Sequence, residues 1–289
     1  MKKRAVSIVI ALLCFSAASQ TSYAHTVSPV NSDAGQTTKA GMNWLAHLPN
    51  RSDNRVMSGA FGGYSRDTFS VAEADRLKHA TGQLPAVYGC DYARGWLEPE
   101  NIADTIGYSC NSELISYWKS GGIPQISMYL ANPAYSTGHF KTPISNSQYQ
   151  NILDSSTTVG KRLDAMLGKI ADGLQQLKDG GLDNLLWVYA PDANRDFKTD
   201  FYPSVSYVDI VGLDAYFTDS YSIKGYDELT SLHKLFAFTE VGPQETNGGL
   251  DYSSLINAIK QNHPKTVYFL AWNDGWSPAA NKGAANSLS

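Results

Sequence analysis

Short apolar segments alternate with amphipathic ones along most of this chain. The apolar segments are rich in β-branched and aromatic residues and are bounded by turn-forming residues, a pattern typical of β-strands. Several are apolar on both faces, as at residues 185–188, which favours parallel strands covered on both sides. Seven such strands are predicted, at residues 55–59, 84–90, 124–130, 184–190, 207–214, 235–240 and 266–273.

Helical periodicity separates the predicted strands. The longest amphipathic stretch covers residues 156–179, where apolar residues recur every three or four positions and form one helical face. Shorter helices are predicted at residues 71–80, 111–119 and 252–261. Strands that alternate with helices indicate an α/β protein built from βα units, and no Ser-, Gly- or Pro-rich linker divides them. We therefore expect one barrel domain of the (β/α)8 TIM barrel type.

The first 24 residues have the pattern of a secretory signal peptide. Basic residues at positions 2–4 precede an apolar run over residues 5–18, and residues 22–24 form a small-x-small cleavage site. Residues 25–50 are interpreted as an N-terminal lead and residues 51–289 as the barrel domain. Removal of 24 residues from the 289 leaves 265, close to the roughly 250 of a typical (β/α)8 barrel.

Composition and charge fit an exported globular protein. Hydrophobic residues make up 43% of the chain and charged residues 17%, which excludes a disordered chain. After the signal segment, 20 basic residues stand against 27 acidic ones, a formal charge of −7 that excludes a basic nucleic-acid footprint. No other stretch has the roughly 18 uninterrupted apolar residues that cross a bilayer. We expect a secreted or periplasmic monomer with no nucleic-acid partner and, once cleaved, no membrane attachment.

Cysteine usage agrees with export. Cys14 lies within the signal segment, which leaves Cys90 and Cys110 as the pair in the mature chain. In an oxidising compartment such a pair is expected to form a disulfide, and closing this loop would contribute about 3 kcal/mol. The alternative is a pair of buried free thiols.

Carboxylates and aromatic residues alternate at the ends of the predicted strands. In a βα barrel these ends converge on one face, where reactive groups gather. They carry Asp91, Tyr92, Asn132, Asp192, Asp214, Tyr216, Glu240, Trp272, Asn273, Asp274 and Trp276. Sugar rings pack against aromatic side chains, and their hydroxyls bind carboxylates and amides. The combination favours a carbohydrate-active site, where cleavage of a glycoside needs two carboxyl groups flanking the bond.

Each of these residues also has a purely structural interpretation. A carboxylate at a strand end can cap a helix or pair with an arginine, such as Arg94 or Arg195. A tryptophan in a strand can belong to the core. The shared position at one barrel face, rather than any single residue, favours the functional interpretation.

Other chemistries lack their motifs. The chain has no G-x-S-x-G nucleophile elbow, and its six histidines are scattered without zinc-site spacing. We therefore expect neither a metal ion nor a cofactor. Residues 59–63 are rich in glycine, but no Lys-Ser/Thr pair follows them, so they are interpreted as a tight turn.

Five runs of sequence indicate one family of carbohydrate-active enzymes. They are YWKSGGIP at 117–124, ANP at 131–133, LLWVYAP at 185–191, YVDIVGLDAY at 207–216 and FTE at 238–240. From about residue 56 to residue 276, the chain closely resembles glycoside hydrolase family 26, the β-mannanases. The resemblance implies a retaining (β/α)8 enzyme that hydrolyses the β-1,4-mannosidic bonds of mannan. It also implies two catalytic glutamates, at the ends of the fourth and seventh strands.

The resemblance also implies roles for individual residues. Glu240 matches the nucleophile, with Tyr216 as its hydrogen-bond partner and Trp272 as a platform for a sugar ring. Further candidates for contacts in the cleft are Asp91, Trp96 and Trp276. Tyr129 stands where the family usually has a histidine, so a sugar contact is expected to be altered there. Asn132 is a further candidate for a sugar contact.

One departure from the family pattern concerns the general acid/base. The family carries this glutamate in an Arg-Pro, His-Glu, Asn-Gly signature on its fourth strand, and this sequence contains no such segment. The helix at 156–179 instead runs through two glycines directly into the strand at 184–190. No residue of this chain is therefore matched to the acid/base.

The strand count predicts an incomplete barrel. Seven strands and 13 residues after Trp276 leave out the fourth βα unit and the final helix. The strands at 124–130 and 184–190 then become neighbours or leave a gap. Three hypotheses follow: a secreted β-mannanase, a mannan-binding protein without catalysis, and a truncated product that folds poorly.

Overall fold

Seven parallel strands form the wall of the molecule in the computed structural model, which describes residues 8–11, 27–53, 55–94, 101–136, 142–182, 185–196 and 198–283. They are β2 (Met57–Tyr64), β3 (Val87–Arg94), β4 (Ile123–Tyr129), β5 (Leu186–Tyr189), β6 (Ile210–Phe217), β7 (Leu235–Pro243) and β8 (Thr266–Ala271). Their order is β4-β3-β2-β8-β7-β6-β5, each parallel to its neighbours. This confirms the predicted α/β barrel architecture and its seven parallel strands.

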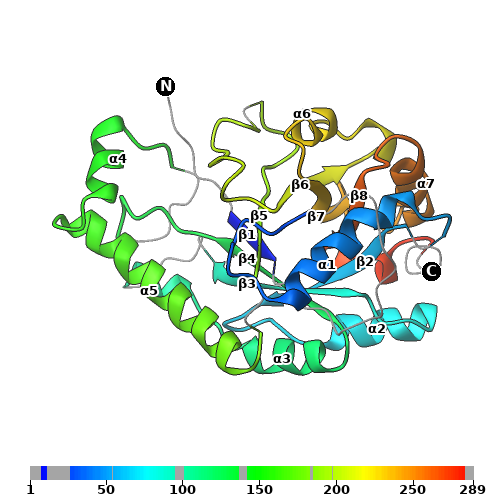
Figure 1. The fold of residues 1–289 in the computed structure, drawn as a ribbon, viewed down its shortest axis with the longest axis horizontal. Helices are drawn as coiled ribbons and strands as arrows, with labels where there is room; N and C mark the ends of the chain where they lie inside the picture. Colours follow the sequence, from blue (N-terminus) through cyan, green and yellow to red (C-terminus); the bar gives the residue numbers. More distant parts are fainter. Residues whose placement is uncertain are drawn as a thin grey trace.

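The wall of parallel strands is interrupted between β4 and β5, where the sequence lacks a βα unit. A short strand, β1 (Ile8–Ala11), occupies the opening and pairs antiparallel with both neighbours (Figure 1). Ile8 lies opposite Met128 on one side and Tyr189 on the other. The two strands therefore neither meet nor leave a gap, because four residues of the predicted signal segment close the barrel.

Helices cover the outside of the wall (Figure 1). The four predicted helices are confirmed as α2 (Ala72–Thr81), α3 (Asn111–Lys119), α5 (Thr158–Asp179) and α7 (Tyr252–Gln261). The structure adds α1 (Gln36–His47), α4 (Asn146–Leu153), α6 (Tyr226–Thr230) and the 3-10 helices η1 (Leu48–Asn50), η2 (Ile102–Thr105), η3 (Ser220–Ser222), η4 (Asp274–Trp276) and η5 (Pro278–Ala280). Among the residues described after β8, no α-helix follows. Within the described ranges, no helix is both long and apolar enough to span a membrane.

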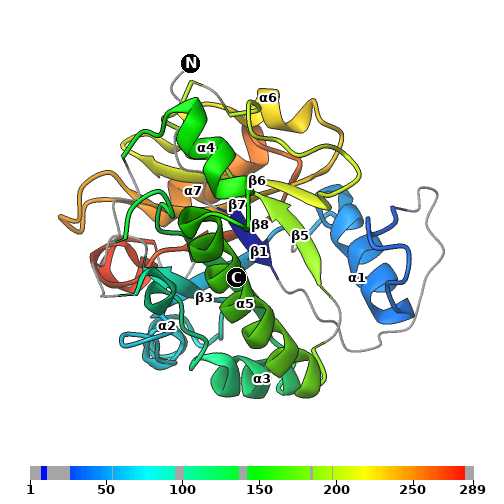
Figure 2. The same cartoon turned by 90° about the vertical axis from the view of Figure 1, so that its left-hand side faces the viewer.

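The segment interpreted as an N-terminal lead contributes to the core. Met42 and Leu45 of α1 and Leu48 of η1 are buried together with residues at the beginnings of the strands, including Met57, Val87, Ile123, Leu186 and Ile210. Figure 2 shows α1 at one side of the barrel, apart from α2, α3 and α5. Because its partners are the first residues of the strands, α1 closes the N-terminal end of the barrel and leaves the opposite end for chemistry.

Several strands reach further toward their C-terminal ends than the sequence predicts. β6 and β7 extend to Phe217 and Pro243. Residues 59–63, which were expected to form a tight turn, lie inside β2, so that prediction is wrong. The glycine at position 62 has a packing cause, since a Cβ there would lie 2.6 Å from the Tyr88 ring and 2.7 Å from the Phe69 ring.

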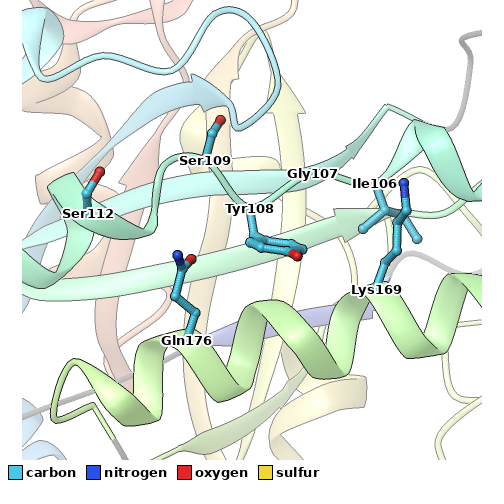
Figure 3. Close-up of a pocket in the computed structure, with 7 residues that line it drawn as sticks. All are labelled: Ile106, Gly107, Tyr108, Ser109, Ser112, Lys169 and Gln176. Atoms are coloured by element: carbon cyan, nitrogen blue, oxygen red, sulfur yellow. The ribbon is translucent and has the colours of Figure 1, made fainter.

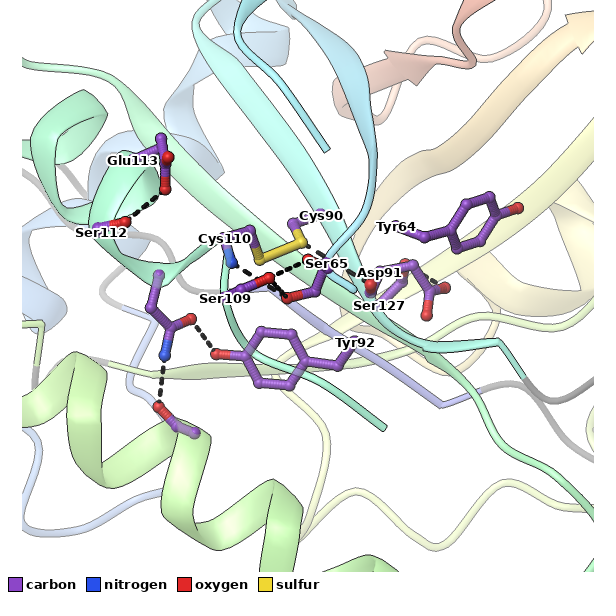
Figure 4. The surroundings of a disulfide bond; sticks show 12 residues. Tyr64, Ser65, Cys90, Asp91, Tyr92, Ser109, Cys110, Ser112, Glu113 and Ser127 are labelled. Atoms are coloured by element: carbon purple, nitrogen blue, oxygen red, sulfur yellow. Dashed lines mark hydrogen bonds between the residues drawn. A yellow bond between two sulfur atoms is a disulfide. The ribbon is translucent and has the colours of Figure 1, made fainter. Parts of the chain in front are cut away.

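The end of β3 is fastened to the helices outside it. Cys90 and Cys110 form a disulfide, which confirms the predicted bond and excludes free thiols (Figure 4). Beside it, the Tyr92 hydroxyl donates to Asn111 Oδ1 at 2.5 Å. Asn111 Nδ2 in turn donates to Gln176 Oε1 on α5 at 2.9 Å. A covalent bond and buried hydrogen bonds thus join β3, α3 and α5.

Candidate active site

Glu240 on β7 and Tyr216 on β6 face each other at the C-terminal end of the barrel. The Tyr216 hydroxyl donates a hydrogen bond to Glu240 Oε1 at 2.5 Å, and both side chains are half-buried. Gly242, in register with Tyr216, leaves room for this contact, since a Cβ there would lie 3.0 Å from the Tyr216 ring and 2.9 Å from that of Trp276. A hydroxyl that donates to a carboxylate favours its ionised form.

A second carboxyl group lies beside Glu240. Asp214 on β6 is in register with Glu240 on β7. The backbone of Asp214 is held on its other side, where its N–H donates to Pro191 O at 3.1 Å and its carbonyl accepts from Ala193 N at 2.8 Å. Its Oδ1 atom is buried and has no hydrogen-bond partner among the described residues. A buried acceptor without a partner is costly and marks a place where a ligand group can bind.

Burial and mutual repulsion change how these two carboxyl groups titrate. Burial raises the pKa of Asp214 to about 8, with the charge of Asp192 adding to the rise and that of Arg195 opposing it. Burial, followed by the charge of Asp214, also raises the pKa of Glu240, while the hydrogen bond from Tyr216 opposes this rise. Since two like charges on adjacent strands repel, the pair retains a proton near neutral pH.

Aromatic side chains surround the pair. Trp272, directly after β8, stacks on Phe61 with ring centroids 3.5 Å apart, and Tyr64 meets its edge at 6.2 Å. The ring of Trp276 lies edge-on to Tyr216 at 6.1 Å. Trp272 and Trp276 are both half-buried, so they combine a fixed position with accessible surface. This is the arrangement that sugar rings require. The predicted contact residue Trp96 lies outside the described residues.

Two predicted contact residues are held inside the protein. Asp91 is 4% exposed, and its carboxylate accepts from Ser127 Oγ at 2.7 Å and from the backbone N–H groups of Ala93 and Tyr129 (Figure 4). Burial nevertheless raises its pKa to about 6. Asn132 is also buried, and its side chain donates to Thr142 O at 3.0 Å. Both residues therefore hold the ends of β3 and β4 and their loops in place.

Tyr129, at the end of β4, lies within electrostatic reach of both carboxyl groups of the pair. Burial raises its pKa to about 12, and the nearby charges of Asp214 and Glu240 add to the rise. Arg195 pairs with Asp192 at 3.2 Å on the loop after β5. Arg94 pairs with Asp67 and lies 5.0 Å from the centre of the Tyr64 ring. Both arginines therefore have acidic partners near the strand ends.

Sequence reasoning missed Tyr64 and Phe61 as parts of this region. Both lie beyond the predicted end of their strand, within β2. Burial raises the pKa of Tyr64, and the charges of Asp91 and Glu240 add to the rise. The two glycines flanked by aromatic residues at 61–64 were a signal that could have indicated a strand with closely packed neighbours.

A separate pocket lies away from the carboxyl pair. Its lining comes from the loop after β3 and from α5, and includes Tyr108, Ser109, Lys169 and Gln176 (Figure 3). Lys169 is already paired with Asp104 at 2.6 Å. No pair of carboxyl groups lines this pocket, so it lacks the groups that glycoside cleavage needs.

The family model of glycosyl hydrolase family 26 matches residues 30–182 and residues 179–288. The chain belongs to glycosyl hydrolase family 26. A mannan endo-1,4-beta-mannosidase of Bacillus subtilis (strain 168) is 60% identical to it, across 98% of this chain and 92% of the relative. Mannan endo-1,4-beta-mannosidase A and B of Caldalkalibacillus mannanilyticus is 39% identical, across 96% of this chain and 65% of the relative. The solved structure of the Bacillus subtilis mannanase BCman shares 63% identity and a TM-score of 0.86, across 90% of this chain and 93% of that one.

The family 26 match breaks at the junction between α5 and β5. Its two stretches end and begin at residues 179–182. The alignment with the relative from strain 168 is 335 positions long against 289 residues in this chain, so at least 46 of its positions have no counterpart here. Both findings agree with the prediction that a segment is missing before the strand at 184–190. The described part of the chain places no second glutamate beside Glu240; its one fully buried glutamate, Glu73, pairs with Arg76 and accepts from Ser277.

Proposed function

We propose that this chain is a glycoside hydrolase that cleaves the β-1,4-mannosidic bonds of mannan with retention of configuration. The observation that carries the proposal is the half-buried Glu240 with its hydroxyl donor, Tyr216, at the C-terminal end of a family 26 barrel. Relatives named as mannan endo-1,4-beta-mannosidases support mannan as the substrate.

Glu240 acts as the nucleophile in this proposal. Its carboxylate attacks the anomeric carbon and forms a glycosyl ester, which water then hydrolyses. Tyr216 keeps the attacking carboxylate ionised, because its hydroxyl hydrogen-bonds to Oε1. Trp272 and Trp276 bind sugar rings on either side of the reacting bond through their exposed faces.

The enzyme is proposed to act outside the cytoplasm as a monomer. The signal-peptide pattern of the first 24 residues and the Cys90–Cys110 disulfide support export, since disulfides persist in oxidising compartments. The chemistry assigned to Glu240 uses no metal ion or cofactor.

The test measures reducing ends released from mannan and the dinitrophenol released from a dinitrophenyl β-mannobioside. Glu240→Ala is compared with the wild type and with Glu113→Gln, a matched control on the exposed face of α3. We expect wild type and control to release product from both substrates, with the aryl substrate the less impaired, and Glu240→Ala to release none. Mass spectrometry after trapping with a 2-fluoro mannoside locates the ester on Glu240.

Equal inactivity of the wild type and Glu240→Ala on both substrates would contradict the proposal. Saturable binding of mannan without turnover, lost in Trp272→Ala, would instead identify a mannan-binding protein that has no catalysis. Cooperative thermal unfolding of the purified chain distinguishes either result from a chain that does not fold.

A further inference from the structure

Because the family match is broken, no residue of this chain is matched to the group that gives a proton to the departing sugar oxygen. Asp214 is the carboxyl group beside the nucleophile. We propose that Asp214 donates this proton when Glu240 attacks the anomeric carbon. The inference rests on the proposed hydrolysis of mannan and adds a catalytic residue to it. Without acid assistance, loss of a sugar alkoxide is slower by roughly 10² to 10⁴.

Asp214 lies next to the nucleophile in the sheet. Asp214 and Glu240 are in register on the adjacent parallel strands β6 and β7. Neighbouring strands lie about 4.8 Å apart, and side chains in register project from the same face of a sheet. The carboxyl groups of retaining glycosidases are about 5 to 5.5 Å apart. Asp214 and Glu240 pair directly after the register shift between these strands, and the spacing of adjacent strands is similar to that of the two carboxyl groups in retaining glycosidases.

The two carboxyl groups differ in their hydrogen bonds, and this difference suits one to be the nucleophile and the other the proton donor. Glu240 accepts a hydrogen bond from Tyr216, which stabilises its charge. Asp214 Oδ1 is buried and has no donor among the described residues. Hydrogen bonding therefore favours the ionised form of Glu240 and does nothing to favour a charge on Asp214 Oδ1.

The surrounding charges act in the same direction. Asp192, on the loop after β5, repels a charge on Asp214, and Arg195 on the same loop attracts it less strongly. Glu240 on β7, Tyr129 on β4 and Tyr216 on β6 also lie near it. Burial, followed by the charge of Asp192, raises the pKa of Asp214 to about 8 against the opposing charge of Arg195, so the donor form is present at neutral pH.

The reaction balances with these two residues and water. Glu240 forms a bond to the anomeric carbon, the bond to the leaving oxygen breaks, and that oxygen takes both the electron pair and the Asp214 proton. The Asp214 carboxylate then removes a proton from water, whose oxygen attacks the anomeric carbon. This step releases Glu240 as a carboxylate and returns the proton to Asp214.

The experiment compares Asp214→Asn with the wild type and with Asp227→Asn, which removes an exposed aspartate on α6. On mannotetraose, Asp214→Asn is expected to lower kcat/KM by about 10² to 10⁴, while on dinitrophenyl β-mannobioside the loss is under about tenfold. Azide, which needs no general base, restores turnover of the aryl substrate and yields a β-glycosyl azide. The fall in wild-type kcat/KM near pH 8 disappears in this variant.

Equal losses on the two substrates, or unchanged activity, would overturn the role of Asp214 while leaving the function of Glu240 intact. Absence of turnover in the wild type would overturn the proposed function and this inference together. If Asp214→Asn does not unfold cooperatively, the wild-type pH profile decides. A kcat/KM that stays constant from pH 7 to about 9.5 would contradict a proton donor whose pKa is about 8.

Discussion

The strand pair β6 and β7 and the seam formed by β4, β1 and β5 are parts of one barrel wall, but they are held together differently. β6 and β7 are parallel, joined through α6, and pair from Ile210 and Leu235 to Phe217 and Pro243, with one register shift between Leu213 and Asp214. The seam is closed by four residues from the start of the chain, which run antiparallel to both neighbours. A missing unit has therefore changed one side of the wall while the side that carries Glu240 keeps its pairing.

The largest expected difference concerns core packing on the two sides. Leu213 on β6 and Leu186 on β5 are both fully buried. Leu→Ala substitutions cost about 2 to 5 kcal/mol, with the cost set by how far the site can collapse. We expect Leu213→Ala to lose about 4 kcal/mol of unfolding free energy and Leu186→Ala about 2, because strands at the seam have fewer fixed neighbours. Urea denaturation of both variants measures this, and equal losses would show that the seam is as rigid as β6 and β7.

The next effect concerns the N-terminal strand itself. Deletion of residues 1–24 removes β1 and leaves the edges of β4 and β5 unpaired. At about 0.5 to 1 kcal/mol for each backbone hydrogen bond, the free energy of unfolding should fall by about 3 kcal/mol. We expect faster amide hydrogen exchange in β4 and β5 and unchanged exchange in β6 and β7. If export removes this segment, the mature protein has these exposed edges.

Val9→Pro in the full-length chain is the matched variant for that deletion. Proline removes a backbone donor in the middle of β1 without shortening the chain. It should reproduce the faster exchange in β4 and β5. Identical exchange in the full-length chain, the shortened chain and this variant would mean that β1 does not support the wall in solution.

The same comparison explains how much the sequence could predict. The parallel strands were predictable because their apolar residues occupy both faces, and the position of Glu240 followed from the FTE run at 238–240. The helix α1 was not predicted, and its buried residues Met42 and Leu45 become core only against the starts of the strands. The position of β1 was not predictable either, since its partners are more than 100 residues away. Local patterns record burial, whereas closure of a barrel depends on distant partners.

The role of Asp91 shows the same limit at the level of one residue. Its place after a strand indicated a cleft contact, yet the structure fills its acceptors with Ser127, Ala93 and Tyr129. A strand end identifies which residues gather at a barrel face, but the neighbours from other strands decide which of them are exposed. Asp214 occupies the same kind of sequence position as Asp91, but its buried Oδ1 has no hydrogen-bond partner among the described residues.

A smaller effect concerns the dependence of stability on pH. The pKa of Asp214 is raised in the folded state from an ordinary value near 3.9 to about 8, so the folded protein holds a proton that the unfolded chain releases. Stability therefore falls as the pH rises from about 4 to 8. Asp214→Asn removes this loss and should raise the free energy of unfolding at pH 8, with little change at pH 4. An equal gain in unfolding free energy at pH 4 and pH 8 would show that the substitution acts through packing rather than through ionisation of Asp214.

The smallest expected effect is at the hydrogen bond between Tyr216 and Glu240. Tyr216→Phe keeps the ring that meets Trp276 but removes the donor at 2.5 Å from Oε1. A hydrogen bond to a charged group contributes about 1.5 kcal/mol or more, so kcat/KM should fall about tenfold. Because the lost bond opposed the rise in the pKa of Glu240, the acidic limb of the pH profile should move to higher pH. Tyr221→Phe, at an exposed tyrosine beyond β6, should change neither. A tenfold loss without movement of the acidic limb would mean that Tyr216 orients the sugar rather than the charge on Glu240.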